Sequence, residues 1–177
     1  MVLVDKNDVA IGEMEKLSAH QNGGVLHRAV SVFLYNELGE LLLQKRASGK
    51  YHSANLWTNT CCGHPRPGEE TADAAARRLK EEMGMSAVLQ LAFTFEYKAT
   101  LQNGLTEYEI DHVYTGVTNN KPCLNTEETS EYRYIDPNQL EEEIKVSPEL
   151  FTEWFKICLR DWRHKLLQVG KHIEKKD

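Results

Sequence analysis

The chain has 177 residues and a formal charge of −6, from 27 acidic and 21 basic side chains. This length favours one domain, and the acidic balance argues against a surface that grips a nucleic-acid backbone. No apolar run approaches the roughly 18 residues of a membrane span, and the first residues lack the basic start and apolar core of a signal peptide. We therefore expect no membrane partner and no secretory leader. The cysteines are Cys61, Cys62, Cys123 and Cys158. They form no CxxC pair, which favours free thiols in a reducing, cytoplasmic compartment.

The first half of the chain predicts a hairpin, a long loop and a helix. The β-prone residues 30–35 and the apolar residues 41–43 flank a turn, as in a β-hairpin. Residues 48–70 are rich in Gly, Pro, Ser and Asn, which is typical of a functional loop. Within 71–83 the apolar residues recur at offsets of 3, 4, 7 and 11 and predict one helical stripe, ending at Gly84.

The second half predicts a sheet followed by helices. Residues 86–97 and 106–117 read as strands around a turn at Asn103-Gly104, and 132–135 read as a third strand. Asp136-Pro137 predicts the cap and first residue of a short helix, and Ser147-Pro148 predicts the start of a longer one. The fold class is therefore α/β (α+β): a mixed sheet with helices on both faces, in one compact domain over residues 1–177.

The most informative pattern lies in residues 63–85. Gly63 is followed after five residues by Glu69, and after seven more by Arg77, with Glu81, Glu82 and Gly84 close behind. This pattern resembles the Nudix box, a loop–helix–loop motif that handles diphosphates through divalent metals. The resemblance breaks at Arg78, where the family pattern calls for glutamate.

Arg78 changes the chemistry that the motif implies. Positions 78 and 82 share one helix face, so a guanidinium stands where a metal-binding carboxylate is expected. Its fork of N–H donors suits a phosphate oxygen. Such a site holds a diphosphate rather than cleaving it. The alternative is that these charges form a solvated helix face.

A second string overlaps the start of that motif. Residues 58–65 read Thr-Asn-x-x-Cys-Gly-His-Pro, which resembles the type I isopentenyl diphosphate isomerases of the Nudix superfamily. The flanking His20, His27, Arg46, Lys50 and Glu107-Tyr-Glu109 agree with that family, and the resemblance runs from about residue 3 to about residue 165. It implies interconversion of isopentenyl and dimethylallyl diphosphate in isoprenoid biosynthesis, by protonation and deprotonation through a tertiary carbocation.

The resemblance also implies two metal sites. One set of candidate ligands comprises His20, His27, His64, Glu107 and Glu109. Imidazoles with carboxylates suit Zn²⁺ or Mn²⁺, and two carboxylates two residues apart share one face of a strand. Glu82 matches the glutamate that binds Mg²⁺ with the diphosphate, and magnesium often bridges a carboxylate and phosphates. The other histidines are His52, His112, His164 and His172, and no motif surrounds them.

The remaining roles concern the substrate, a small isoprenoid diphosphate. Cys62 and Glu109 match the family's catalytic acid and base, and the order in which they act is open. Tyr97 matches a tyrosine that relays or orients a proton. Lys16, Arg46, Lys50 and Arg78 match the residues that hold the diphosphate. Trp154 matches an aromatic residue that stabilises the cation, or is a core residue of an amphipathic helix.

We expect the isomerase to be a monomer. Two other functions are alternatives to the isomerase. A Nudix pyrophosphohydrolase of a nucleoside diphosphate derivative would not require Cys62, and Arg78 argues against it. A diphosphate-binding module without activity would not need the complete set of catalytic and metal-binding residues. Both alternatives therefore explain fewer of the residues present.

Overall fold

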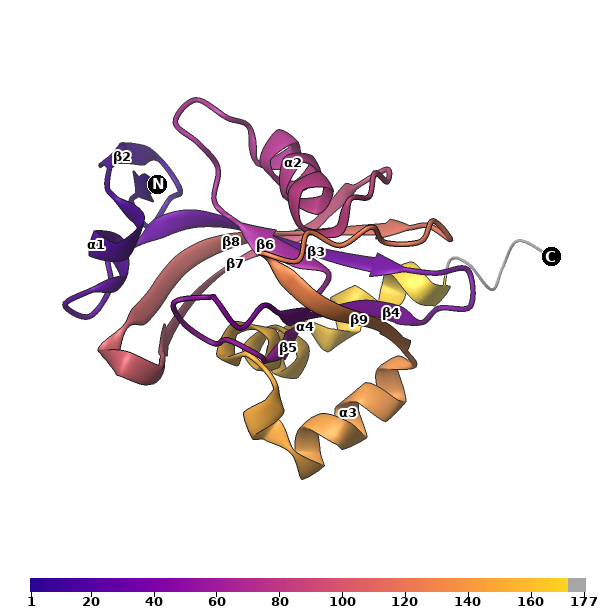
Figure 1. Ribbon diagram of the computed structural model, residues 1–177. Helices are drawn as coiled ribbons and strands as arrows, with labels where there is room; N and C mark the ends of the chain where they lie inside the picture. Colours follow the sequence, from indigo (N-terminus) through magenta and orange to yellow (C-terminus); the bar gives the residue numbers. More distant parts are fainter. Residues whose placement is uncertain (172–177) are drawn as a thin grey trace.

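The computed structural model describes residues 1–171 of the chain (Figure 1). None of the helices described there has the length and apolar character that a membrane crossing requires. The elements in chain order are β1 (Val2–Val4), β2 (Ala10–Glu13), α1 (Lys16–His20), β3 (His27–Tyr35), β4 (Leu41–Arg46), β5 (Trp57–Thr58), β6 (Cys61–Gly63), α2 (Thr71–Met83), β7 (Gln90–Thr100), β8 (Thr106–Val117), β9 (Thr129–Ile135), α3 (Pro137–Val146) and α4 (Glu153–Lys171), with 3₁₀ turns at Gln102–Gly104 and Pro148–Leu150.

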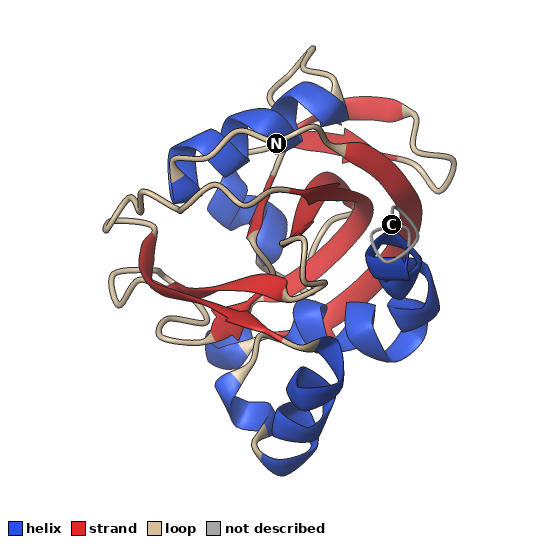
Figure 2. Ribbon diagram, turned by 90° about the vertical axis from the view of Figure 1, so that its right-hand side faces the viewer, coloured by secondary structure: helices blue, strands red, loops and turns tan. Residues whose placement is uncertain are grey.

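The strands form one mixed, strongly curved sheet around β3 (Figure 2). β3 runs parallel to β8 from the pair His27–Glu109 to the pair Tyr35–Val117. It is antiparallel to β6, and it meets β4 at the pair of Tyr35 with Leu41. β4 then pairs with β5 and β9, while β7 pairs with β8. The sheet thereby brings His27 and Glu109, 82 positions apart in the sequence, directly side by side.

Alternation along β3 separates two cores, one on each face of the sheet. Its even-numbered apolar residues pack against α2, and Phe33 and Tyr35 pack in the core that contains α4. In Figure 1, α2 lies above the sheet and α3 and α4 lie below it. The predicted mixed sheet with helices on both faces is confirmed.

Local signals placed several element ends correctly. Gly84 ends α2 in the left-handed region at φ 64°, where a β-carbon would collide with the carbonyl of Cys123. The Asp136 carboxylate accepts hydrogen bonds from the backbone N–H groups of Asn138 and Gln139 and caps α3. The turn at Asn103-Gly104 has positive φ at both residues, as predicted for that dipeptide.

Several predicted boundaries were wrong, among them the starts of β3 and β9, which lie at His27 and Thr129, and in two further cases a distant segment supplies backbone partners. The region 48–70 is not continuous loop, since β5 pairs with β4 and β6 pairs with β3. β7 begins at Gln90 rather than residue 86 and continues to Thr100. The C-terminal helix begins at Glu153 and not at Ser147-Pro148, because the chain first docks on Trp57. There Thr152 N–H donates to the Trp57 carbonyl at 3.0 Å.

Candidate active site

A cavity of about 600 Å³ lies against β3, β6, β8 and α2 and is partly closed by the loop before Trp57. All predicted site residues except His20 and His27 line it directly. Those residues are Lys16, Arg46, Lys50, Cys62, His64, Arg78, Glu82, Tyr97, Glu107, Glu109 and Trp154. His20 and His27 lie beside it in contact with His64. The structure therefore brings the whole predicted set together.

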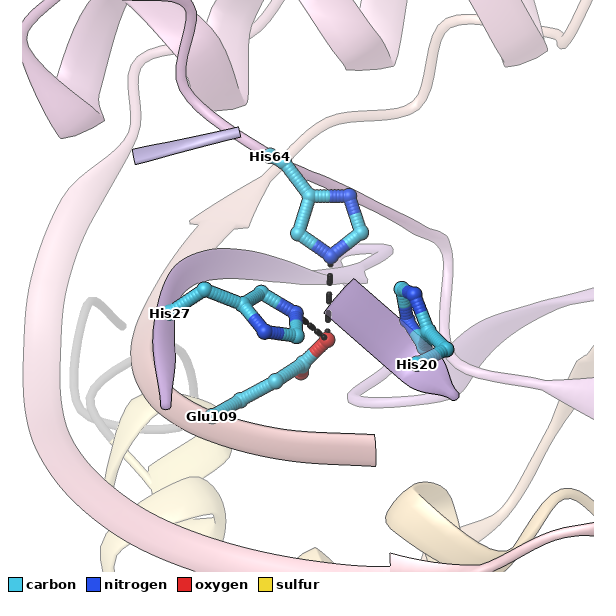
Figure 3. Close-up of side chains that lie close together, drawn as sticks. All are labelled: His20, His27, His64 and Glu109. Atoms are coloured by element: carbon cyan, nitrogen blue, oxygen red, sulfur yellow. Dashed lines mark hydrogen bonds and ion pairs between the residues drawn. The ribbon is translucent and has the colours of Figure 1, made fainter. Parts of the chain in front are cut away.

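Four potential metal ligands converge at one end of this cavity (Figure 3). His20 ends α1, His27 begins β3, His64 follows β6, and Glu109 lies in β8. One ligand atom from each lies within 4.8 Å of all the others. The Nε2 atoms of His27 and His64 lie 3.2 and 3.0 Å from Oε1 of Glu109.

The tautomers of two histidines follow from their backbone contacts. Nδ1 of His20 lies 2.7 Å from the Lys16 carbonyl and Nδ1 of His27 lies 2.7 Å from the Val25 carbonyl, so each Nδ1 carries the donated proton. Both Nε2 lone pairs then face the cluster. The Nε2 of His20 is buried and has no hydrogen-bond partner within residues 1–171.

This arrangement fits a divalent cation. A neutral His27 would point its lone pair at a carboxylate oxygen, which is repulsive unless a proton or a metal ion lies between them. Burial lowers the pKa of His20 and lowers the pKa of His64 to about 4, so burial works against added protons at these two rings. Imidazole and carboxylate donors in this number suit a first-row divalent ion.

Glu107 stands next to this cluster and outside the group of four converging atoms. Burial and the neighbouring Glu109 charge raise its pKa well above the usual range. Burial by itself would also raise the pKa of Glu109, whereas His27 and His64 lower it well below its usual range when their Nε2 atoms carry protons. The hydroxyl of Tyr97 lies 2.6 Å from Oε2 of Glu109 and 3.0 Å from Oε2 of Glu107. Its one proton can serve only one carboxylate at a time.

Cys62 faces the same cavity, whereas Cys61 does not. Alternation along β6 turns Cys61 into the fully buried core beneath α2 and turns Cys62 toward the opposite face. The Cys62 thiol donates to Oδ1 of Asn59 at 3.1 Å and lies 3.6 Å from Oγ of Ser31. Burial, followed by the nearby Asp111 charge, raises the pKa of Cys62, so the group is a thiol at neutral pH.

Four cations, Lys16, Arg46, Lys50 and Arg78, gather along the wall of the same cavity. Burial lowers the pKa of Lys16, and repulsion from Lys50 and Arg46 lowers it further. Lys50 pairs with Glu128, and Nη2 of Arg78 lies 3.2 Å from the same carboxylate. This concentration of positive charge suits a bound polyanion.

Arg78 is held on the Nudix helix by neighbours of opposite charge. It pairs with the buried Glu82 and with Glu81, and its Nε donates to the Cys62 carbonyl at 3.2 Å. Glu82 also accepts from Nε2 of Gln44 at 2.5 Å. The alternative of a solvated helix face does not hold for Arg78 and Glu82, because both are largely buried and line the cavity.

Several neighbours of the site were missed from the sequence, and His52 is one of them. The ring of His52 lies 5.9 Å from Trp154 and 6.0 Å from His20, and its Nε2 is 3.9 Å from Oε1 of Glu107. No motif surrounds His52. Its only sequence signal is its position just after Lys50, in a loop that Arg46 holds through the carbonyls of residues 52 and 53.

Trp154 is 5 % exposed, and its indole N–H has no hydrogen-bond partner in the described part of the chain. The Arg46 guanidinium lies 5.2 Å from its ring centre. Among the histidines left unassigned, His112 pairs with Asp8 at 2.9 Å and His164 is exposed on α4. His172 lies outside the described residues.

Comparison with known proteins defines the class first. Residues 25–155 match the model of the NUDIX domain. The crystal structure of DR0079 from Deinococcus radiodurans shares the fold, with a TM-score of 0.74 and 20% identity over 92% of this chain and 98% of that one. The fold and the site thus define a Nudix-domain protein.

Curated relatives narrow this class. The chain is 50% identical over 157 residues to the isopentenyl-diphosphate Delta-isomerase of Pectobacterium atrosepticum, covering 89% of this chain and 87% of that protein. It is 46% identical over 159 residues to isopentenyl-diphosphate Delta-isomerase 2 of Aromatoleum aromaticum, covering 90% and 84%. The chain belongs to the isopentenyl-diphosphate Delta-isomerase family, as the sequence predicted.

Proposed function

We propose that this chain interconverts isopentenyl and dimethylallyl diphosphate by moving a proton across a C=C bond. One observation carries the proposal. The thiol of Cys62 and the Tyr97-bonded carboxylate of Glu109 face one cavity that four cations also line. The cations suit the diphosphate, and the thiol and carboxylate suit the alkene.

The diphosphate would lie against the four cations that line the cavity. Lys16, Arg46, Lys50 and Arg78 supply its charge-assisted hydrogen bonds, which are roughly twice as strong as neutral ones. Phosphate oxygens would replace Glu128 as the partner of Lys50 and Arg78, which relieves the repulsion that lowers the pKa of Lys16. Glu82 would hold Mg²⁺ between the diphosphate and the protein.

The proton transfers would use groups on either side of the alkene. One proton adds to the terminal CH₂ and gives a tertiary cation, and another leaves the adjacent methylene, with Cys62 and Glu109 as the donor and acceptor. Tyr97 orients the Glu109 carboxylate through its 2.6 Å hydrogen bond. Trp154 would offer its ring face to the cation, worth about 2 kcal/mol in a desolvated site.

His20, His27, His64 and Glu109 would hold Mn²⁺ or Zn²⁺, with Glu107 adjacent. When bound, such an ion supplies a fixed positive charge that orients Glu109 and balances the acidic side chains. We also propose a monomer. A reducing, cytoplasmic compartment is proposed as well, and it is supported by four free thiols, Cys61, Cys62, Cys123 and Cys158.

The deciding experiment is incubation with isopentenyl diphosphate and Mg²⁺ while both products are followed. We expect dimethylallyl diphosphate without release of inorganic phosphate. A Cys62→Ala variant should lose turnover, and Cys123→Ala, which changes an exposed thiol, should keep it. Phosphate or pyrophosphate release without the isomer would instead establish the hydrolase. The hydrolase is disfavoured because Arg78 stands where a carboxylate would serve the metal.

A further inference from the structure

Asp111 is a buried acid that the proposed chemistry leaves unused. It lies on β8 two residues beyond Glu109 and is 2 % exposed. Its Oδ2 accepts a hydrogen bond from Oγ of Ser31 at 2.7 Å, and its Oδ1 has no partner among residues 1–171. No ion pair to Asp111 forms within the described chain. A buried acid with one hydrogen-bond partner is costly to ionise, so packing alone does not account for it.

Ser31 connects this acid to the reactive thiol. In the pairing of β3 with β6, Ser31 lies directly opposite Cys62, and Oγ approaches Sγ at 3.6 Å. A serine hydroxyl has one proton, and here it is donated to Asp111. The oxygen lone pairs of Ser31 are therefore left to face Cys62.

Asn59 fixes the other side of the thiol. Its Nδ2 donates to the carbonyls of Val32 and Cys61 at 3.1 and 2.9 Å, which sets the orientation of the buried amide. Oδ1 must then point to Cys62, whose thiol donates to it at 3.1 Å. Cys62 thus lies between two oxygen acceptors whose directions are each set by a second hydrogen bond, and its one proton can be donated to only one of them at a time.

We propose that Ser31 and Asp111 are positioning residues for Cys62. Asp111 locks the Ser31 hydroxyl, and Ser31 with Asn59 sets the direction in which the thiol enters the cavity. This inference rests on the proposed role of Cys62 in the isomerase reaction. Both residues act on turnover through Cys62 and form no hydrogen bond or ion pair with Lys16, Arg46, Lys50 or Arg78 within the described chain, so binding of the diphosphate should stay unchanged.

The test compares steady-state kinetics and melting temperatures of the full chain and four variants. Ser31→Ala removes the hydroxyl, Ser31→Thr keeps it, and Asp111→Val replaces the acid with a strand-favouring side chain of similar size. Tyr114→Phe is the matched control, because it removes a buried hydroxyl contact (Thr71 Oγ1, 2.7 Å) on the opposite face of β8.

We expect kcat to fall on the order of tenfold in Ser31→Ala and Asp111→Val, with KM for isopentenyl diphosphate within about twofold. Ser31→Thr and Tyr114→Phe should keep kcat within about threefold of the parent. Asp111→Val should melt no lower than the parent, because it removes a poorly partnered buried acid. A purely structural role for Asp111 predicts the reverse, a lower melting temperature with kcat retained.

Two outcomes overturn the inference: a kcat within about twofold of the parent in both Ser31→Ala and Asp111→Val, or a loss in Ser31→Ala that Ser31→Thr does not rescue. If Ser31→Ala fails to fold, Asp111→Val decides by the same criteria. Cys62→Ala separates this inference from the proposed function. Activity in Cys62→Ala overturns the catalytic role of Cys62 and the inference with it, whereas a parent that forms no dimethylallyl diphosphate overturns the proposed function. An inactive Cys62→Ala beside fully active Ser31 and Asp111 variants overturns the inference alone.

Discussion

Adding Mn²⁺ or Zn²⁺ to metal-free protein should raise its melting temperature, and His20 should be required for that rise. The physical reason is the Nε2 atom of His20, which is buried without a partner in the described structure while its Nδ1 donates to the Lys16 carbonyl. A buried nitrogen left without a hydrogen bond destabilises the fold by about 1–3 kcal/mol. A metal ion would satisfy it and would screen the Glu109 carboxylate from the facing lone pair of His27.

The expected size of the rise follows from the preformed geometry. Four ligands around a tetrahedral ion at about 2.0–2.1 Å stand about 3.4 Å apart. The Glu109 contacts with His27 and His64, at 3.2 and 3.0 Å, already have that spacing. At a free metal concentration 100 times Kd, binding adds about 2.7 kcal/mol. In a domain of this size that is a rise of about 5 to 10 °C.

The assay is differential scanning calorimetry with and without metal after treatment with a chelator. Mn²⁺ is the better first choice, since Zn²⁺ also binds the thiols of the unfolded chain and so weakens the shift. In His20→Ala the rise should drop below about 2 °C. His164→Ala, which changes an exposed histidine on α4, should retain the full rise. An equal rise in His20→Ala and the parent would refute the four-ligand site.

Three further predictions concern the carboxylates and the Nudix helix. Arg78→Gln should raise KM for isopentenyl diphosphate on the order of tenfold or more, since it removes a charge-assisted contact to the diphosphate; an unchanged KM in steady-state kinetics would contradict that role. Tyr97→Phe should lower kcat by about 10- to 100-fold while the protein stays folded, because the Glu109 carboxylate loses its 2.6 Å donor; full turnover would exclude Tyr97 from the reaction. Glu69→Gln should lower stability by about 1 kcal/mol at pH 7, because Arg77 grips Glu69 through bonds of 2.7 and 2.8 Å. The Arg77 hydrogen bond lowers the pKa of Glu69 to about 2. That stabilisation is therefore present above about pH 4.5 and is lost as pH falls toward 2. Urea midpoints should differ at pH 7 and converge near pH 2, and a gap of constant size would count against the ion pair.

Much of the fold could be predicted from the amino-acid sequence because the signals for these elements are local. The apolar stripe of α2, the left-handed Gly84 and the Asp136 cap depend on neighbours within one or two helical turns. The start of α4 was not readable, because it depends on how Thr152 docks on Trp57, about 95 positions earlier. β6 was hidden for the same reason, since its partner is the middle of β3.

The site residues also differ in whether their sequence signal is local or depends on a distant contact. Residues in spaced motifs, such as Cys62 and His64, could be assigned roles before any geometry was known. Residues that support them could not be found, because the contact that gives each one meaning joins distant strands or loops. Ser31 reaches Asp111 across 80 positions, and His52 reaches Glu107 across 55. A serine in a β-prone run and a histidine in a polar loop carry no sign of either partner.

The parallel pairing of β3 with β8 also bears on how the protein folds. His27 and Glu109 become neighbours only when these two strands, separated by residues 36–105, have paired. Long-range parallel pairing is slow, because loop-closure entropy must be lost before the contacts form. The metal ligands therefore assemble late, and an ion that needs all of them gains little in the folding transition state. Metal should accordingly slow unfolding and leave the refolding rate nearly unchanged. The bound ion then stabilises the native state without stabilising the folding transition state.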